Sequence, residues 1–402
     1  MIVVKFGGTS LSGAERIRAA ARIVAAHLRK QPVACVVSAM AGVTDSLLSI
    51  SDLARSGDQS RHELLAELHS RHLDTLTALT ETIDSRAAYR QRVSAAWHRL
   101  EADLHQLLSE RFESEEAQGH AVTAFSAWGE RLSILLFATT LAAEHIPANP
   151  FEGEPIILTG QTEAAIDHRA WQGQVCQTPL TPSVEATRGW LTPQIAGLLQ
   201  EGIVSVLPGY LGRTREGLVT TLGRNGSDYS AALIGAALHA KAVYIYSDVA
   251  GIHRADPRIM PEAQLLPALT YEDAAVIARL GARVLHPDTL LPLAQQGIPL
   301  HLRSAIAPEA PGTDIGPAHL FDQHGSQQEP WVIAARPLAA KQHHPAALDY
   351  QPGMVEVIGA FLRKQRGGFL QRISVAVAAA ESVTTQRRLY AELARTSGAA
   401  YH

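Results

Sequence analysis

The chain opens on an apolar, β-branched run at residues 2–6 that ends directly at two glycines, Gly7 and Gly8. Such a run is typical of a buried strand, and the glycines allow the backbone to turn tightly after it. Thr9 and Ser10 then precede a helix that we expect over residues 14–30. A buried strand, a tight turn and a helix in this order favour a sheet covered by helices.

Lys5 stands at the end of this strand, beside the di-glycine turn. A cation at that place suits contact with phosphate oxygens, because turns rich in glycine also present backbone amides to anions. The structural alternative is a lysine that extends from the strand end into solvent. The turn is not a Walker-type P-loop, because the GxxxxGK[ST] spacing is absent.

A second glycine-rich turn at residues 222–228 follows a short apolar run and precedes an Ala-rich helix expected at 229–239. Ser227 and Asp228 are favoured N-cap residues, and free amides at a helix start attract anions. Arg224 adds a guanidinium that suits carboxylate or phosphate. Alone, such a loop is more often structural, but two turns of this kind in one chain favour an anion-binding site.

The remaining pattern alternates strands and helices. A long helical stretch at 61–118 indicates an inserted helical hairpin, and residues 160–193 are expected as loops with short strands. Further strands are expected at 33–38, 204–208, 242–247 and 299–303, and further helices at 127–143, 271–280 and 287–296. This alternation predicts an α/β fold with a mainly parallel central sheet sandwiched by helices.

Polar residues near the ends of these elements are further candidates for a site. Glu130 lies in the first turn of the helix at 127–143, where it either complements the helix dipole or contacts a ligand. Asp248, Asp256 and Arg258 follow the strand at 242–247, and open α/β sheets bind ligands at such strand ends. The alternative for this second group is a solvated loop.

Composition limits the class of protein. A length of 402 residues predicts two or three domains, and a net charge of −4 gives no electrostatic reason to expect nucleic acid or an anionic membrane. Cys35 and Cys176 lie far apart without metal-ligand spacing, which fits a reducing compartment. The apolar run at 134–143 is too short to cross a bilayer, and the chain opens on a core strand rather than a signal segment. We therefore expect a soluble, cytoplasmic protein.

Six motifs, in this order, resemble those of the aspartokinases of the amino acid kinase family. They are KFGGTS at 5–10, SAMAGVTD at 38–45, GERLS at 129–133, LGRNGSDYSA at 222–231, SDVAGIHRADPR at 247–258 and GARVLHP at 281–287. The resemblance covers roughly residues 1–316 and is closest to kinase portions fused to homoserine dehydrogenase. It implies the amino acid kinase fold and ATP-dependent phosphorylation of the aspartate side chain, with Mg²⁺, in the biosynthesis of lysine and threonine.

The resemblance also implies roles for single residues. Lys5, Gly7 and Gly8 would hold the transferring phosphate, and Asp228 would orient the cationic groups around it. The residues implied to hold aspartate are Ser38, Thr44, Glu130, Arg224 and Ser227. Those implied to hold the nucleotide, with Lys5, Gly7 and Gly8, are Ser247, Asp248, His253, Arg258 and Arg283, the last also counted as catalytic. No side chain is expected to be a dedicated metal ligand.

Three of these positions depart from the family pattern: Ser247 replaces Thr, His253 replaces Tyr and Arg283 replaces Lys. Arg and Lys are not interchangeable near phosphate, so turnover or nucleotide preference is expected to differ. Two alternatives therefore stay open. One is a weakly active or non-catalytic regulatory paralogue, and the other is a kinase for another aspartate-like carboxylate.

The tail departs most. The resemblance predicts a catalytic domain at 1–316, a linker at 317–330 and a truncated or degenerate α+β ACT-like region at 331–402, with strands at 332–335 and 373–380 and helices at 353–366 and 384–395. Two complete ACT modules would need more residues, so we expect little inhibition by lysine or threonine. The tail is expected instead to pair subunits in a homo-oligomer, a dimer.

Overall fold

The computed structural model describes residues 1–80, 86–109, 115–159, 181–223, 226–279, 285–317, 331–337, 354–361, 372–378 and 382–396. The chain divides into two compact units. The first comprises Met1–Val249 with Arg303–Glu309, and the second comprises Ala250–Leu302 with Ala310–His402. The domain boundaries that the sequence suggests, at 316 and 330, stay a prediction.

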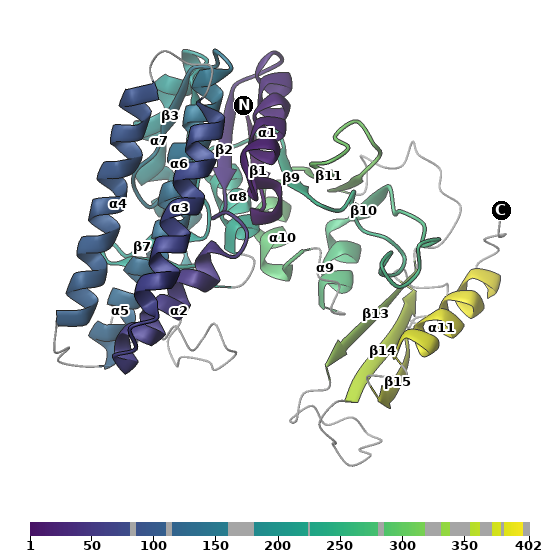
Figure 1. Ribbon diagram of the computed structural model, residues 1–402. Coiled ribbons are helices and arrows are strands. Elements are labelled where there is room, and N and C mark those ends of the chain that lie inside the picture. Colours follow the sequence, from purple (N-terminus) through teal and green to yellow (C-terminus); the bar gives the residue numbers. More distant parts are fainter. Residues whose placement is uncertain are drawn as a thin grey trace. The chain divides into compact units, whose positions relative to one another are not determined.

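Five parallel, neighbouring strands of one larger sheet form the centre of the first unit (Figure 1). These strands lie in the order β9 (Val243–Ser247), β1 (Ile2–Phe6), β2 (Val33–Val37), β6 (Val204–Pro208) and β3 (Ala148–Pro150). Every residue of β1, β2 and β6 is buried, as expected for Val- and Ile-rich strands that are covered on both faces. The predicted mainly parallel sheet is confirmed.

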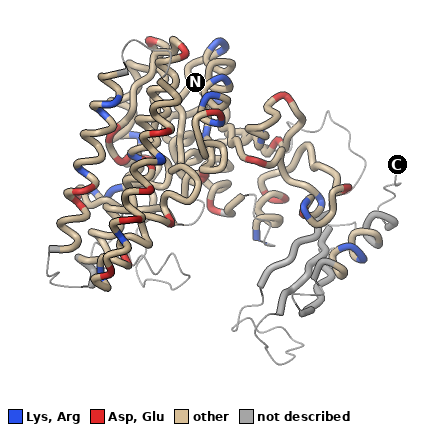
Figure 2. The backbone as a smooth tube through the Cα atoms, in the orientation of Figure 1, with Lys and Arg blue, Asp and Glu red and all other residues tan. Residues whose placement is uncertain are grey.

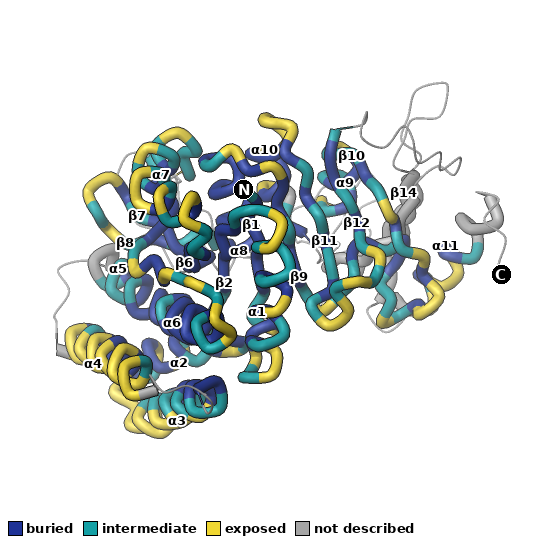
Figure 3. The backbone as a smooth tube through the Cα atoms, turned by 90° about the horizontal axis from the view of Figure 1, so that it is seen from above, coloured by how far each residue is buried: buried dark blue, intermediate teal, exposed yellow. Residues whose placement is uncertain are grey.

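Helices cover both faces of this sheet. On one face α1 (Ala14–Leu28) and α6 (Trp128–Ala143) contact each other and pack on a core that includes Ile2, Val4 and Phe6 of β1. On the other face α8 (Gly226–Ala237) contacts β1, β2 and β9, and α7 (Val184–Gln200) contacts β6 and α8. Because α6 and α8 are apolar nearly all round, both are almost completely buried (Figure 3).

The expected helical stretch is confirmed as three helices that follow α2 (Val43–Ser56). These are α3 (Arg61–Leu79), α4 (Arg86–Ser109) and α5 (Glu115–Ser126). They extend the core on the α6 side through Leu76, Trp97 and Leu100, while much of α3 and α4 is exposed (Figure 3). This arrangement places α4 beside the first turns of α6.

The prediction of loops at 160–193 is wrong over its last part, where α7 begins. Ser183 caps this helix, since its hydroxyl accepts a hydrogen bond from the Ala186 N–H at 3.1 Å. Leu191 and Ile195 are buried on one side of the helix, so their packing outweighs the local preference of Pro193. Residues 160–180 lie outside the described residues.

A small sheet completes the first unit. It contains β5 (Thr181–Pro182), β4 (Ile156–Thr159), β7 (Leu211–Arg213) and β8 (Val219–Thr221), in that order. β7 and β8 form an antiparallel hairpin directly before the second glycine-rich turn. The hairpin therefore sets where that turn begins.

The second unit contains an αβ segment and a separate antiparallel sheet. In the αβ segment, β12 (Thr313–Gly316) pairs with β10 (Ala268–Thr270) in parallel and with β11 (Leu300–Ser304) in antiparallel, beside α9 (Tyr271–Arg279) and α10 (Pro287–Ala294). The expected strand and helices of this segment are confirmed. The C-terminal sheet has the order β13 (Trp331–Pro337), β14 (Met354–Phe361), β15 (Arg372–Ala378), and α11 (Ser382–Thr396) packs on it.

The helix expected at 353–366 is wrong, because β14 occupies most of that range. Its residues pair with β13 on one side and with β15 on the other, so every backbone position gains a partner strand. Cross-strand pairing of a Val-rich segment thus overrides its local helical pattern. The strands expected in the tail and its last helix are confirmed, while the ACT-like assignment stays a prediction.

The surface carries charges of both signs. On the helices of the first unit, acidic and basic residues alternate without a large region of one sign (Figure 2). Across the described residues, no helix combines the length and the apolar character that crossing a membrane requires.

Candidate active site

A pocket of about 320 Å³ lies in the first unit, at the edge where β1, β2 and β6 end. Parallel strands bring their carboxyl ends to one edge of a sheet, which is where open α/β sheets bind ligands. The residues that line the pocket are Lys5, Gly7, Gly8, Ser38, Ala39, Met40, Ala41, Gly42, Thr44, Asp45, Glu130, Tyr210, Gly223, Gly226, Ser227 and Asp228. Eight of these are residues that the sequence singled out.

Lys5 and Asp228 form an ion pair inside this pocket. Lys5 is the penultimate residue of β1. Asp228 lies in the first turn of α8, which packs on β1. Both side chains are nearly buried, with 8% and 12% of their surface exposed. A lysine held in this way has a fixed position, so it can offer a preorganised positive charge to a ligand.

The two glycines after Lys5 allow the backbone to approach its neighbours closely. A Cβ on Gly8 would lie 2.8 Å from the Ala39 carbonyl oxygen, which no real side chain tolerates. Gly8 accepts a hydrogen bond from the Ala41 N–H at 3.1 Å, so this turn is tied to the segment after β2. The requirement for glycine at position 8 is therefore one of close approach, as the sequence predicts for this turn.

Glu130 is buried at the pocket wall, with 3% of its surface exposed. Its Oε1 accepts a hydrogen bond from the Ala39 N–H at 3.0 Å, while Oε2 has no hydrogen-bond partner among the described residues. Burial raises the pKa of this carboxyl to about 8, and the Ala39 amide opposes that shift. A buried, half-satisfied carboxylate at a pocket wall suits a ligand that brings a cation.

Two helix N-termini contribute to the pocket. Gly42, in the left-handed conformation with φ of 80°, precedes α2, whose first turn holds Thr44 and Asp45. Gly226 begins α8, so Ser227 and Asp228 lie in its first turn. The prediction that these two residues cap the helix is therefore wrong. The positive ends of both helix dipoles therefore border the pocket and favour an anion there.

Tyr210 is a pocket residue that sequence analysis missed. It adopts φ of 65°, which is rare for a bulky side chain, and burial raises the pKa of its phenol to about 12. Side-chain hydrogen bonds with Thr221 and Ser126 connect it to the hairpin and to the end of α5. The signal that was available is its place directly after the carboxyl end of β6, at Gly209–Tyr210.

Two of the residues expected to bind the nucleotide, Ser247 and Asp248, lie outside the lining of the pocket. Ser247 is the last residue of β9 and Asp248 follows it. β9 pairs with β1 in the first unit, and the Gly7 N–H donates to the Tyr246 carbonyl at 3.3 Å. The two residues therefore lie at the end of the strand next to Lys5, but they do not line the pocket. The Ser247 hydroxyl donates to the Val249 carbonyl at 3.1 Å, and Asp248 is exposed.

The structure describes two of the four remaining predicted residues. His253 and Arg258 belong to the second unit. There His253 forms an isolated antiparallel β-bridge with Leu265, and the exposed Arg258 forms an ion pair with Asp256 at 2.9 Å. Arg224 and Arg283 lie outside the described residues, so their roles stay predictions.

The pocket thus combines opposite electrostatic features in a small volume. Its lining includes an ammonium, two helix N-termini and a glycine turn, which suit an anionic group such as phosphate. It also includes the buried carboxyl of Glu130, which suits an ammonium or a guanidinium. This combination fits a ligand that carries both charges beside a transferable anionic group.

Comparisons with known proteins show the family of this chain. The model of the amino acid kinase family matches residues 1–304. The aspartokinase of Chlamydia trachomatis is 32% identical over 322 residues, which cover 78% of this chain and 64% of that protein. Lysine-sensitive aspartokinase 3 of Escherichia coli is 31% identical over 314 residues, which cover 78% of this chain and 63% of that protein. The chain thus spans slightly less than two thirds of the length of these relatives.

The fold has a counterpart among solved structures. A crystal structure of E. coli aspartokinase III in complex with aspartate and ADP superimposes with a TM-score of 0.76 at 20% identity, covering 98% of this chain and 99% of that chain. At this identity the likeness concerns the fold alone. Since the family model matches well over half of the sequence, this chain belongs to the amino acid kinase family.

Proposed function

We propose that this protein is an aspartate kinase, which transfers the γ-phosphoryl group of ATP to the side-chain carboxylate of L-aspartate to give 4-phospho-L-aspartate. The observation that carries the proposal is the pairing of two features in one pocket: the Lys5–Asp228 ion pair and the half-satisfied carboxyl of Glu130. Identities of 32% and 31% with aspartokinases support the choice of aspartate as the acceptor.

The chemistry asks for little acid–base work from the protein. A carboxylate is already ionised at neutral pH, so its oxygen attacks the γ-phosphorus directly while the bond from that phosphorus to the ADP oxygen breaks. The difficulty is to bring two anions together in line, which requires positioning and positive charge. Lys5 and the N-termini of α2 and α8 supply that charge, and Asp228 holds the Lys5 ammonium in place.

The residues that we assign to aspartate recognition are Ser38, Thr44, Glu130, Arg224 and Ser227. The ammonium of the substrate pairs with Glu130, whose Oε2 then gains the partner that it lacks in the free protein. Arg224 binds the α-carboxylate through its guanidinium, and Ser38, Thr44 and Ser227 border the same space. When the substrate binds, the buried, neutral carboxyl of Glu130 loses its proton and becomes part of an ion pair.

We assign the nucleotide to the end of β9, the strand next to that of Lys5, where Ser247 and Asp248 lie. The nucleotide-binding roles expected of His253, Arg258 and Arg283 stay predictions from the sequence. Mg²⁺ would be held here together with the phosphates of the nucleotide. Asp228 fits such an ion, since Mg²⁺ prefers oxygen ligands and is commonly held by one or two carboxylates with substrate phosphates. When bound, Mg²⁺ neutralises part of the phosphate charge.

The product, an acyl phosphate, suits a subsequent reduction or substitution at the same carbonyl. This is the chemistry of a first step in the biosynthesis of aspartate-derived amino acids, including lysine and threonine, which we propose as the physiological setting.

Hydroxylamine trapping tests the proposal, because acyl phosphates react with hydroxylamine to give coloured hydroxamates. The purified chain is incubated with ATP, Mg²⁺ and one of several carboxylates: L-aspartate, D-aspartate, L-glutamate, N-acetyl-L-glutamate or succinate. Hydroxamate and ADP should form with L-aspartate and fall sharply with succinate, which lacks the ammonium that Glu130 binds. A stronger signal with another carboxylate would reassign the acceptor, and ADP release without any hydroxamate would overturn the proposal.

A further inference from the structure

A second cavity of about 330 Å³ lies in the first unit, between α4, the start of α6 and the segment after β3. It is as large as the candidate active site but shares none of its lining residues. The residues that line it are Arg99, Ala102, Asp103, Trp128, Arg131, Ile134, Leu135 and Glu152. Nothing in the proposed kinase reaction uses this cavity.

Trp128 forms a rigid wall of the cavity. Its indole Nε1–H donates a hydrogen bond to Asp103 Oδ2 at 2.6 Å, and only 5% of the residue is exposed. The guanidinium carbons of Arg131 and Arg99 lie 5.1 Å and 5.8 Å from the centre of its ring. The tryptophan is therefore fixed at its edge and flanked by two cations.

Arg131 is the better anchored of these cations. It forms an ion pair with Glu154 at 2.7 Å, and the two side chains are 21% and 11% exposed. Glu154 does not line the cavity, so it holds Arg131 from outside. This second carboxylate positions the guanidinium beside the ring before any ligand arrives.

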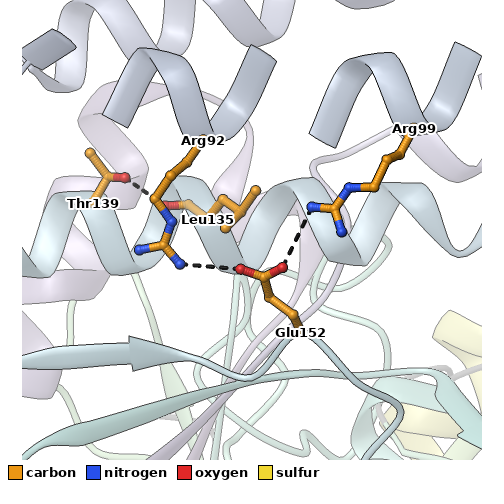
Figure 4. Close-up of polar contacts among 5 residues, drawn as sticks. All are labelled: Arg92, Arg99, Leu135, Thr139 and Glu152. Carbon is orange, nitrogen blue, oxygen red and sulfur yellow. Dashed lines mark hydrogen bonds and ion pairs between the residues drawn. The ribbon is translucent and has the colours of Figure 1, made fainter. Parts of the chain in front are cut away.

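Glu152 lines the cavity and lies between two arginines of α4 (Figure 4). Its distances are 3.2 Å to Arg92 and 3.5 Å to Arg99, and all three side chains are about half exposed. Exposed ion pairs of this length contribute little, so a ligand can replace the longer one without much cost. Arg92 contacts the same carboxylate but does not line the cavity.

We propose that this cavity binds a free zwitterionic α-amino acid with an apolar side chain. Its charged lining is balanced, because it contains two cations, Arg99 and Arg131, and two carboxylates, Asp103 and Glu152, which disfavours a simple anion or a simple cation. The ligand carboxylate lies between Arg99 and Arg131, and its ammonium lies between Glu152 and Asp103. The side chain packs on Ile134, Leu135 and Ala102 next to the ring.

Isothermal calorimetry of the purified full chain with L-leucine and L-phenylalanine tests the proposal without any activity measurement. At least one of them should bind at millimolar or lower concentration. Arg99→Gln and Glu152→Gln should each weaken that binding by about ten- to a hundredfold, since each removes a charged partner. Arg92→Gln is the matched control: it also loses a contact to Glu152, but binding should stay within about twofold.

Two analogues separate recognition of the zwitterion from simple apolar binding. Leucinamide lacks the carboxylate and 4-methylpentanoate lacks the ammonium, so both should bind at least about tenfold more weakly than L-leucine. Absence of binding for both amino acids overturns the proposal. So does equal binding to the wild-type, Arg99→Gln and Glu152→Gln proteins, because the ligand would then occupy another place. These outcomes are independent of the hydroxamate assay, so the two proposals can fail separately.

Discussion

The ammonium of Lys5, at the end of β1, forms a nearly buried ion pair with the carboxylate of Asp228, in the first turn of α8. The two residues are more than two hundred positions apart in the sequence, and the packing of α8 on β1 brings them together. Each charge offsets the desolvation of the other, so neither can be removed without effect on the other.

Lys5→Met is expected to lower kcat by about 100-fold or more, because it removes a preorganised charge beside the transferring phosphate. It should also destabilise the protein by roughly 2–4 kcal/mol, since Asp228 is left buried without its partner. Steady-state kinetics with ATP and aspartate, together with urea unfolding, measure the two effects.

The double variant Lys5→Met/Asp228→Asn separates catalysis from folding. It replaces both charges, so it should recover most of the lost stability while its kcat stays low. Recovery of activity along with stability would mean that Lys5 acts on the fold alone.

The KM for aspartate is expected to fall as the pH rises from 6 to 8. The pKa of Glu130 in the free protein is raised to about 8, so below that pH most molecules must lose a proton before the carboxylate pairs with the substrate ammonium. The fall should approach tenfold per pH unit well below pH 8 and then level off. A KM that does not change with pH over this range would remove Glu130 from the acceptor site.

The same shift has a consequence for stability in the absence of substrate. The carboxyl titrates near its ordinary value of 4.5 in the unfolded chain and near 8 in the folded one, so the folded state holds the extra proton between these values. This group therefore makes the protein less stable as the pH rises through that window, by on the order of a few kcal/mol in total. Glu130→Gln should thus be more stable than wild type at pH 8.5, and the gain should disappear towards pH 4.5 in urea unfolding.

Gly8→Ala is expected to lower kcat/KM by at least about tenfold, because the new methyl group would displace the Ala39 carbonyl and with it the Ala39 N–H that holds Glu130. Gly13→Ala is the matched control. It lies in the same turn region, but its Cβ would meet no atom within 4 Å, so activity should change less than twofold. Equal losses in the two variants would point to a general effect on the turn.

Arg224→Ala is expected to raise the KM for aspartate much more than the KM for ATP, since the guanidinium is assigned to the α-carboxylate of the acceptor. Initial rates over a grid of both substrates measure the two constants together. A rise confined to ATP would move Arg224 to the nucleotide and leave the α-carboxylate without an assigned partner.

Much of the candidate active site was available from the sequence because its parts are local. The run at 2–6 with its di-glycine turn, and the turn before α8, each carry their own signal in residue type and spacing. Parallel strands then bring such turns to a common edge by geometry alone. Lys5, Gly8, Glu130 and Asp228 could therefore be singled out before their distances were known.

Other features depended on contacts between distant segments. Local composition suggested a helix at 353–366 and loops up to residue 193, but strand pairing on both sides produced β14, and burial of Leu191 and Ile195 produced α7 through Pro193. Tyr210 was missed because its left-handed backbone is set by the hairpin and by α5, not by its own residue type.

The sequence by itself determined the alternation of strands and helices, the two glycine turns and the charged residues they carry, because these follow from short-range patterns. Tertiary structure alone decided which charges meet and what burial does to them. Asp228 faces Lys5, and Glu130 keeps a proton near neutral pH, because packing of α8 and α6 on the sheet excludes water from these groups. No pattern in the sequence reports that exclusion, since it depends on every segment that covers the site.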